Sequence, residues 1–155
     1  MASTHTPSPP TGPVLFAYDG CDMATFAIEH AGLQLAPGRE ALVVCVWQPG
    51  DVGFVPTGGR RLHAAQATEV RAAAEETAAH GASLAQQAGF RAQSMAVEAA
   101  PTWKGVVAVA DERDASLIVL GSHRRTGLAG HLLGSVAAAV VAHSTASVLV
   151  VHQRA

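Results

Sequence analysis

The last quarter of the chain restricts the fold most. From position 116 to position 152 it reads SLIVLGSHRRTGLAGHLLGSVAAAVVAHSTASVLVVH. An apolar run, Leu117–Leu120, ends at Gly121, and a polar segment with several glycines follows. Gly134-Ser135 then precedes an alanine- and valine-rich stretch, and a second apolar run, Val148–Val151, lies near the end of the chain. A buried strand, a loop, a helix and another buried strand form a βαβ unit, which requires a parallel sheet.

The preceding residues repeat the same alternation. Apolar or alternating runs predict strands, and helical spacing of apolar residues predicts helices between them. The predicted strands are Val14–Tyr18, Ala41–Trp47 and Arg91–Glu98, and the predicted helices are Met23–Leu35, capped by Asp22, Leu62–Ala88 and Pro101–Arg113. Strands that alternate with helices indicate an α/β fold, with helices on both faces of a parallel sheet.

Two polar turns follow strands that would be neighbours in such a sheet. If the strand order is 3-2-1-4-5, the first and fourth strands end side by side at Asp19 and Gly121. Ligands of doubly wound sheets bind at this point, beyond the carboxyl ends of the strands. We therefore expect a crevice between these two ends.

Composition limits the class of protein. The chain has 155 residues, of which 49% are hydrophobic and 14% charged, so it can bury one core. We expect a disordered tail over residues 1–12, rich in Pro, Ser and Thr, and a single domain over residues 13–155. A formal net charge of −2 argues against binding of nucleic acid through phosphate neutralisation.

No feature of the sequence indicates export or a membrane. No apolar run approaches the roughly 20 residues of a membrane span. The N-terminus lacks the basic and apolar regions of a signal peptide. The two cysteines, Cys21 and Cys45, form no disulfide framework, so the sequence predicts a cytoplasmic protein.

Asp19 and Gly134-Ser135 each allow two interpretations. Asp19 would accept hydrogen bonds from the hydroxyls or amines of a ligand, or it would form a turn that caps the next helix. Ser135, at a helix start, would offer its amide and hydroxyl to an anion such as phosphate, or the Gly-Ser pair would be plain capping. Both alternatives stay open from the residues alone.

Catalytic patterns are missing from the sequence. The histidines are dispersed, with His123 and His131 alone inside the glycine-bearing loop, and no Ser-His-Asp constellation or Walker-type loop occurs. We predict no catalytic and no metal-ligating residues. Any enzymatic turnover would at most be slow.

The chain resembles the universal stress protein family over residues 13–152. The family loop reads Gly, two residues, Gly, nine residues, Gly, then Ser or Thr; Gly121, Gly134 and Ser135 match it, whereas Arg124 replaces the second glycine. The resemblance implies a doubly wound five-stranded parallel sheet of order 3-2-1-4-5. It also implies a stress-response sensor or regulator that binds ATP or AMP, with Mg²⁺ as an accompanying ion. The implied nucleotide-binding residues are Ala17, Tyr18, Asp19, Val46, Leu120, Gly121, His123, Arg124, Gly134, Ser135 and Val136.

Arg124 leaves two functional outcomes. Its guanidinium would pair with a phosphate, or its side chain would fill the crevice. In the second case the chain would be a dimeric interaction module of the same fold that has lost nucleotide binding.

The partner predictions concern the last strand. In the 3-2-1-4-5 order, the apolar strand Ser147–His152 lies at an edge of the sheet, where an unpaired strand promotes association. We expect a homodimer through this strand and a regulatory protein partner that the sequence does not identify. We also expect Cys21, before a helix start, to have a lowered thiol pKa and to react faster than the strand residue Cys45.

Overall fold

A computed structural model describes residues 10–49, 60–122 and 133–153. Its strands and helices alternate along the chain, as predicted. The elements are β1 (Val14–Ala17), α1 (Asp22–Gln34), β2 (Glu40–Trp47), α2 (Arg60–Gln87), β3 (Arg91–Glu98), α3 (Thr102–Glu112), β4 (Leu117–Gly121), α4 (Ser135–His143) and β5 (Ser147–Val151). Residues 1–9 of the predicted tail and residues 50–59 of the loop after β2 lie outside the described residues.

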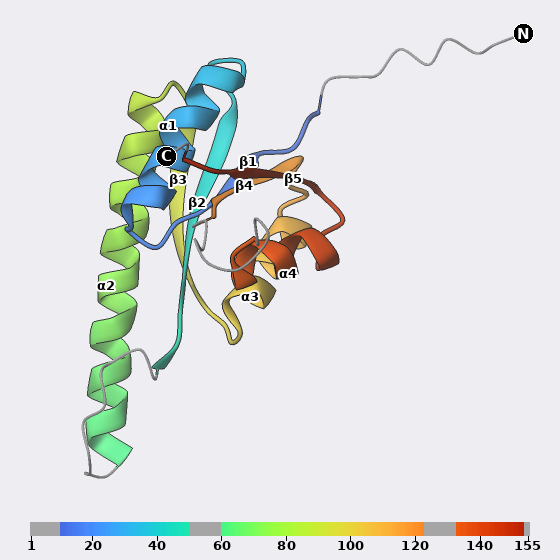
Figure 1. The fold of residues 1–155 in the computed structure, drawn as a ribbon. Coiled ribbons are helices and arrows are strands. Elements are labelled where there is room, and N and C mark those ends of the chain that lie inside the picture. Colours follow the sequence, from blue (N-terminus) through green and yellow to red (C-terminus); the bar gives the residue numbers. More distant parts are fainter. Residues whose placement is uncertain (1–9, 50–59, 123–132, 154–155) are drawn as a thin grey trace, which may run out of the picture.

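The five strands form one parallel sheet in the order β3-β2-β1-β4-β5. Helices α1 and α2 cover one face, and α3 and α4 cover the other (Figure 1). The prediction of a doubly wound α/β fold is confirmed. Because β1 and β4 are adjacent, the strand order reverses between them, and the crevice expected there is part of the fold.

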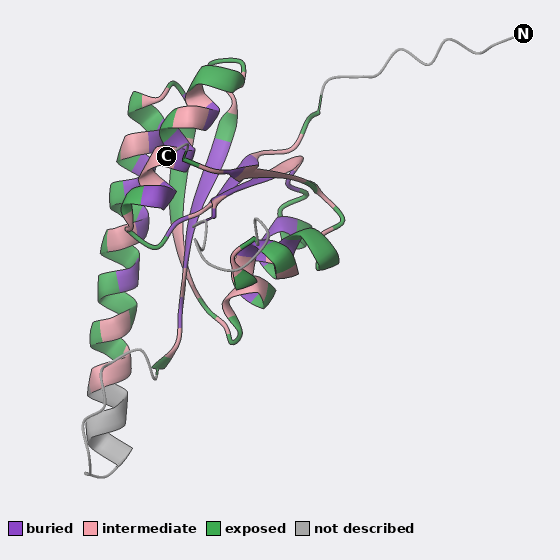
Figure 2. Cartoon of the chain, viewed as in Figure 1, coloured by how far each residue is buried: buried purple, intermediate pink, exposed green. Residues whose placement is uncertain are grey.

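Strand alternation divides the core into two layers. Phe16 and Val43 face α1 and α2, whereas Leu15 and Val44 face α3 and α4. All four are almost fully buried. The central strands of the sheet are largely buried (Figure 2). Burying a side chain of this size stabilises a fold by about 1.5–3 kcal/mol. A Phe16→Ala change, which also leaves a cavity, should cost about 3–5 kcal/mol.

The start of α1 differs from the expectation. Asp22 is the first residue of the helix and not its cap, so that prediction is wrong. The N-cap is Cys21, which has extended backbone angles and a sulfur that accepts a hydrogen bond from the Ala24 amide at 3.4 Å. A thiol therefore takes the place of the oxygen acceptor that usually caps a helix.

Strand β5 forms one edge of the sheet, as the predicted order requires. Val148, Leu149 and Val150 are half-buried, and they contact the helices on both faces. The other edge strand, β3, carries mostly exposed and polar residues on its first half. Among the described residues, no helix is long and apolar enough to cross a membrane.

Candidate functional site

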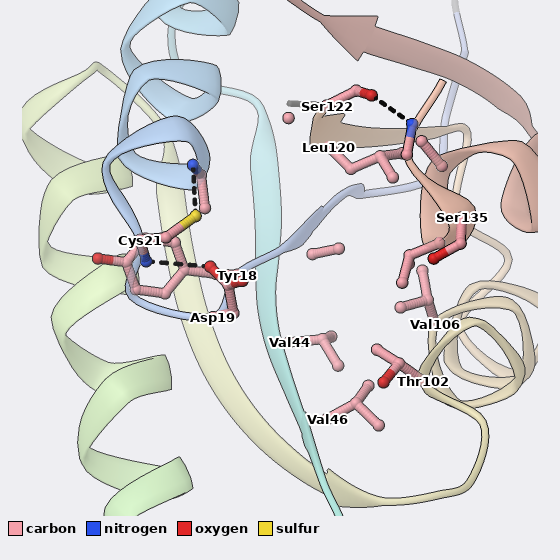
Figure 3. A pocket seen from close by; sticks show the side chains of 16 residues that line it. Tyr18, Asp19, Cys21, Val44, Val46, Thr102, Val106, Leu120, Ser122 and Ser135 are labelled. Atoms are coloured by element: carbon pink, nitrogen blue, oxygen red, sulfur yellow. Dashed lines mark hydrogen bonds between the residues drawn. The ribbon is translucent and has the colours of Figure 1, made fainter. Parts of the chain in front are cut away.

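A pocket of about 300 Å³ opens at the carboxyl ends of β1, β2 and β4, at the edge of the sheet where the strand order reverses (Figure 3). Its lining comes from these strands and from the first turns of α1, α3 and α4. The lining residues are Ala17, Tyr18, Asp19, Cys21, Ala24, Val44, Val46, Thr102, Val106, Leu120, Gly121, Ser122, Gly134, Ser135, Val136 and Ala137.

Most of the predicted binding residues lie together around this pocket. Nine of the eleven line it: Ala17, Tyr18, Asp19, Val46, Leu120, Gly121, Gly134, Ser135 and Val136. The other two, His123 and Arg124, lie outside the described residues. Segments far apart in the sequence therefore meet around one pocket.

One wall of the pocket is apolar. Ala17, Val44, Val46 and Leu120 share the strand parity that faces α3 and α4, and Val106 contributes from α3. The wall is therefore an extension of the hydrophobic core to the end of the sheet. Such a wall suits a flat, weakly polar group, because contact there removes apolar surface from water.

Gly121 allows α1 to approach the pocket closely. A Cβ atom at this position would lie 2.7 Å from the carbonyl oxygen of Met23. Real side chains do not tolerate such contacts without movement of the backbone. The absence of a side chain at the end of β4 thus brings the first turn of α1, with Cys21 and Ala24, to the edge of the pocket.

At the α1 end of the pocket, side chains of the protein itself accept hydrogen bonds from the amides of the helix start. Asp19 Oδ1 accepts a hydrogen bond from the Cys21 amide at 3.0 Å, and Cys21 Sγ accepts one from the Ala24 amide. Asp19 therefore forms the predicted turn, and its exposed carboxylate also lines the pocket. The two interpretations of Asp19 are compatible in this geometry.

The thiol of Cys21 departs from the expectation for a helix start. Partial burial raises its pKa, and a hydrogen bond and charge repulsion from the Asp19 carboxylate raise the pKa further. A backbone hydrogen bond from Ala24, which outweighs the charge repulsion, and a weaker one from Met23 lower the pKa, but the net shift is upward. The predicted lowering of this pKa is wrong. The predicted order of reactivity stays a prediction, with Cys45 buried in β2 and Cys21 half-buried.

The α4 end of the pocket has no side-chain cap on its first-turn amides among the described residues. Its N-cap is Gly134, which provides no side-chain cap, and the first hydrogen bond within the helix runs from the Ala138 amide to the Gly134 carbonyl at 2.9 Å. The amides of Ser135 and Val136 precede that bond, so they have no partner within the helix. Ser135 is the first helical residue rather than a cap, so plain capping does not describe it.

The side chain of Tyr18 faces away from the pocket. Its ring belongs to the core layer under α1 and α2, and its hydroxyl lies 3.3 Å from the Thr25 hydroxyl. Its amide donates to the Val44 carbonyl at 2.9 Å. Tyr18 thus borders the pocket through its backbone, and strand alternation from Phe16 was the signal for this orientation.

The sequence did not indicate the contribution of α3. Thr102 and Val106 line the pocket beside Val46, and the Thr102 side chain lies toward the cavity (Figure 3). A Cβ at Gly105 would lie 3.0 Å from both methyl carbons of Val46, so this glycine lets α3 approach β2 closely. The position of Thr102 depends on that crossing, which no local pattern encodes.

The described lining offers binding groups rather than an evident catalytic set. It holds one carboxylate, Asp19, and three aliphatic hydroxyls, those of Thr102, Ser122 and Ser135, whereas the Tyr18 hydroxyl lies at Thr25. Within residues 10–49, 60–122 and 133–153, no three His, Cys, Asp or Glu side chains form a group that could hold a metal ion. The chemistry of this lining is hydrogen bonding to a ligand with a polar end and an apolar end.

The fold and the pocket define a doubly wound α/β protein with a ligand crevice at its switch point. The model of the universal stress protein family matches residues 11–152, and the chain belongs to this family. Comparison with curated protein sequences gave no significant match.

Solved structures of the family have the same fold. A universal stress protein in complex with cAMP is 27% identical, with 93% of this chain and 98% of that chain covered and a TM-score of 0.67. A universal stress protein from Archaeoglobus fulgidus is 25% identical, with 90% and 98% covered and a TM-score of 0.64. A further structure from that organism, in complex with dAMP, is 21% identical, with 92% and 98% covered and a TM-score of 0.55.

Proposed function

We propose that this chain binds an adenine nucleotide, ATP or AMP, in the pocket at the switch point and acts as a nucleotide sensor or regulator. One observation carries the proposal: a single cavity joins an apolar wall to an exposed carboxylate and an uncapped helix N-terminus. A nucleotide has matching parts in the same order: a flat base, a hydroxylated sugar and an anionic end. At about 300 Å³ the cavity lies at the lower limit of the range for small-molecule sites.

Each part of the nucleotide has a proposed neighbour. The base lies against Val46 and Leu120 on the apolar wall. The Asp19 carboxylate accepts hydrogen bonds from the sugar hydroxyls. The phosphate oxygens accept hydrogen bonds from the amides of Ser135 and Val136 and from the Ser135 hydroxyl. The positive end of the α4 dipole favours an anion there.

The relatives support the chemical class of the ligand. Two solved members of this family are complexes with cAMP and with dAMP, both adenine nucleotides. Neither contains a triphosphate, so the proposal for ATP rests on the open α4 end of this chain.

Calorimetric titration of the purified protein with ATP, AMP and GTP tests the proposal. We expect saturable binding of ATP or AMP and much weaker binding of GTP. The Arg124→Gly variant, which restores the family loop, distinguishes the nucleotide sensor from an interaction module that has lost nucleotide binding. No binding by the wild-type protein together with a gain in Arg124→Gly would replace the nucleotide sensor with the interaction module.

We also propose that β5 pairs with β5 of a second copy. Its residues Val148, Leu149 and Val150 remain half-buried at a sheet edge, and Val141 on the adjacent α4 is 48% exposed. An edge with apolar side chains on both faces is stabilised by pairing. Val150→Lys should therefore yield monomers or insoluble protein, and an unchanged dimer mass by light scattering would contradict the pairing.

A further inference from the structure

Ser122 links the end of β4 to the start of α4. Its side chain is buried, with 3% of its surface exposed, and it lines the nucleotide pocket. Its hydroxyl oxygen accepts a hydrogen bond from the Gly134 amide at 2.8 Å, across twelve positions of sequence (Figure 3). Its own amide donates to the Val151 carbonyl on β5 at 3.0 Å. Ser122 is therefore held to the sheet, and it holds the N-cap of α4.

The hydrogen bond replaces one that a helix with a capping box makes for itself. In a capping box, a Glu or Gln at the third helical position accepts from the N-cap amide. The third residue of α4 is Ala137, which has no acceptor in its side chain. Ser122 supplies the missing acceptor from β4.

The source of this acceptor matters for an anion. A carboxylate at Ala137 would lie in the first turn of α4 and would repel a phosphate near the Ser135 and Val136 amides. The hydroxyl of Ser122 is neutral, and it occupies only the Gly134 amide. The first-turn amides of Ser135 and Val136 stay available, and the helix end stays fixed to β4.

We infer that Ser122 is a positioning residue for the phosphates: it orients the α4 N-terminus towards the pocket and leaves the first-turn amides open to an anion. This inference rests on the proposed function and adds a residue that acts through Gly134 rather than on the ligand. It predicts that loss of Ser122 weakens binding of the phosphates and not of the base, because the base lies against β2 and β4 and does not depend on the α4 end.

The test compares Ser122→Ala with Ser144→Ala in the full-length protein. Ser144 is a matched control at the other end of α4, since its hydroxyl accepts from the Ala146 amide at 3.0 Å and it does not line the pocket. Each variant is titrated with ATP, adenosine and inorganic tripolyphosphate. We expect Ser122→Ala to bind ATP and tripolyphosphate about tenfold more weakly, because the amides of Ser135 and Val136 are no longer held in place for the phosphates. Adenosine binding should change less than about twofold, and Ser144→Ala should leave all three ligands unchanged.

Two further measurements exclude a general loss of structure. Ser122→Thr keeps a hydroxyl and should restore ATP binding. Hydrogen exchange of the Gly134 amide, measured by nuclear magnetic resonance without ligand, should be slow in the wild-type protein and faster in Ser122→Ala. An equal loss of adenosine and ATP, or an unchanged exchange rate at Gly134, would overturn the inference.

The outcomes for the two proposals are distinct. If the wild-type protein binds tripolyphosphate but not adenosine, and Ser122→Ala weakens that binding, the adenine proposal fails and the role of Ser122 stands. If the wild-type protein binds adenosine and Ser122→Ala keeps full affinity for ATP, the role of Ser122 fails and the adenine proposal stands. If the wild-type protein binds neither adenosine nor tripolyphosphate, both the adenine proposal and the role of Ser122 fail.

Discussion

Three helix N-termini border the pocket, and two of them, those of α1 and α4, differ in what satisfies their amides. At α1, Asp19 and Cys21 supply acceptors to the Cys21 and Ala24 amides. At α4, Gly134 offers no side chain, and Ser122 occupies only the amide of the cap itself. The α1 end therefore presents negative charge to a ligand, whereas the α4 end presents open donors. From this comparison we expect side-chain capping, and not the helix dipole alone, to decide which end suits an anion.

Closing the α4 end should have the largest effect on phosphate binding. Gly134→Asp places a carboxylate acceptor at the N-cap, in an extended backbone conformation that any residue adopts. Loss of the amides and repulsion should weaken ATP binding at least about a hundredfold. Calorimetry should show adenosine binding nearly unchanged.

The control for this change is Gly134→Ala. A Cβ at this position meets only the Ser122 oxygen among the described atoms within 4 Å, at 3.4 Å, so the fold should tolerate it. ATP binding in Gly134→Ala should stay closer to wild type than in Gly134→Asp. Equal losses in the two variants would show that space, rather than capping, governs the α4 end.

Changing the α1 end should affect the sugar and not the phosphates. Asp19→Ala removes the exposed carboxylate, and we expect adenosine and ATP to bind about tenfold more weakly, in equal proportion. Asp22→Ala is the control, because Asp22 is an exposed first-turn residue of α1 that does not line the pocket. A loss confined to ATP would contradict the assignment of this end.

A smaller effect is expected on the apolar wall. Thr102 has the one hydroxyl that α3 contributes to the described lining, beside Val46. Thr102→Val keeps the shape of the side chain and should weaken adenosine binding about fivefold, as for one neutral hydrogen bond. Thr102→Ser keeps the hydroxyl and should stay near wild type. An unchanged affinity in the valine variant would make Thr102 a packing residue only.

The smallest effect concerns pH and the α1 cap. Because the pKa of Cys21 is raised in the folded chain, the folded state holds the thiol proton more tightly than the unfolded state does. This contribution to stability is present below the usual thiol pKa and is lost as pH rises through the raised value. Thermal unfolding should show that Cys21→Ser loses less stability between neutral and alkaline pH than wild type. A steeper loss in the variant would contradict the raised pKa.

Much of the fold could be predicted because its signals are local. The run Leu117–Leu120 reads as a buried parallel strand, and the weak alternation of Arg91–Glu98 reads as an outer one; both strands form. The family resemblance then placed Asp19 and Ser135 at one crevice, and both line the same pocket.

The rest of the site depends on contacts that local sequence does not encode. Thr102 reaches the pocket only because Gly105 lets α3 approach Val46. Ser122 acts on Gly134, twelve positions away, and no periodic pattern links them. Cys21 was expected to respond to the helix dipole, but burial and the neighbouring Asp19 dominate its pKa.

The central claim is that a nucleotide places its phosphates at the open α4 end of the pocket. The most direct test is a nuclear magnetic resonance titration of ¹⁵N-labelled protein with ATP and with adenosine. We predict that ATP shifts the amide signals of Ser135 and Val136 and that adenosine leaves them nearly unchanged, while both ligands shift Val46. Shifts of Ser135 and Val136 that are the same for the two ligands, or no shift with ATP, would contradict the account.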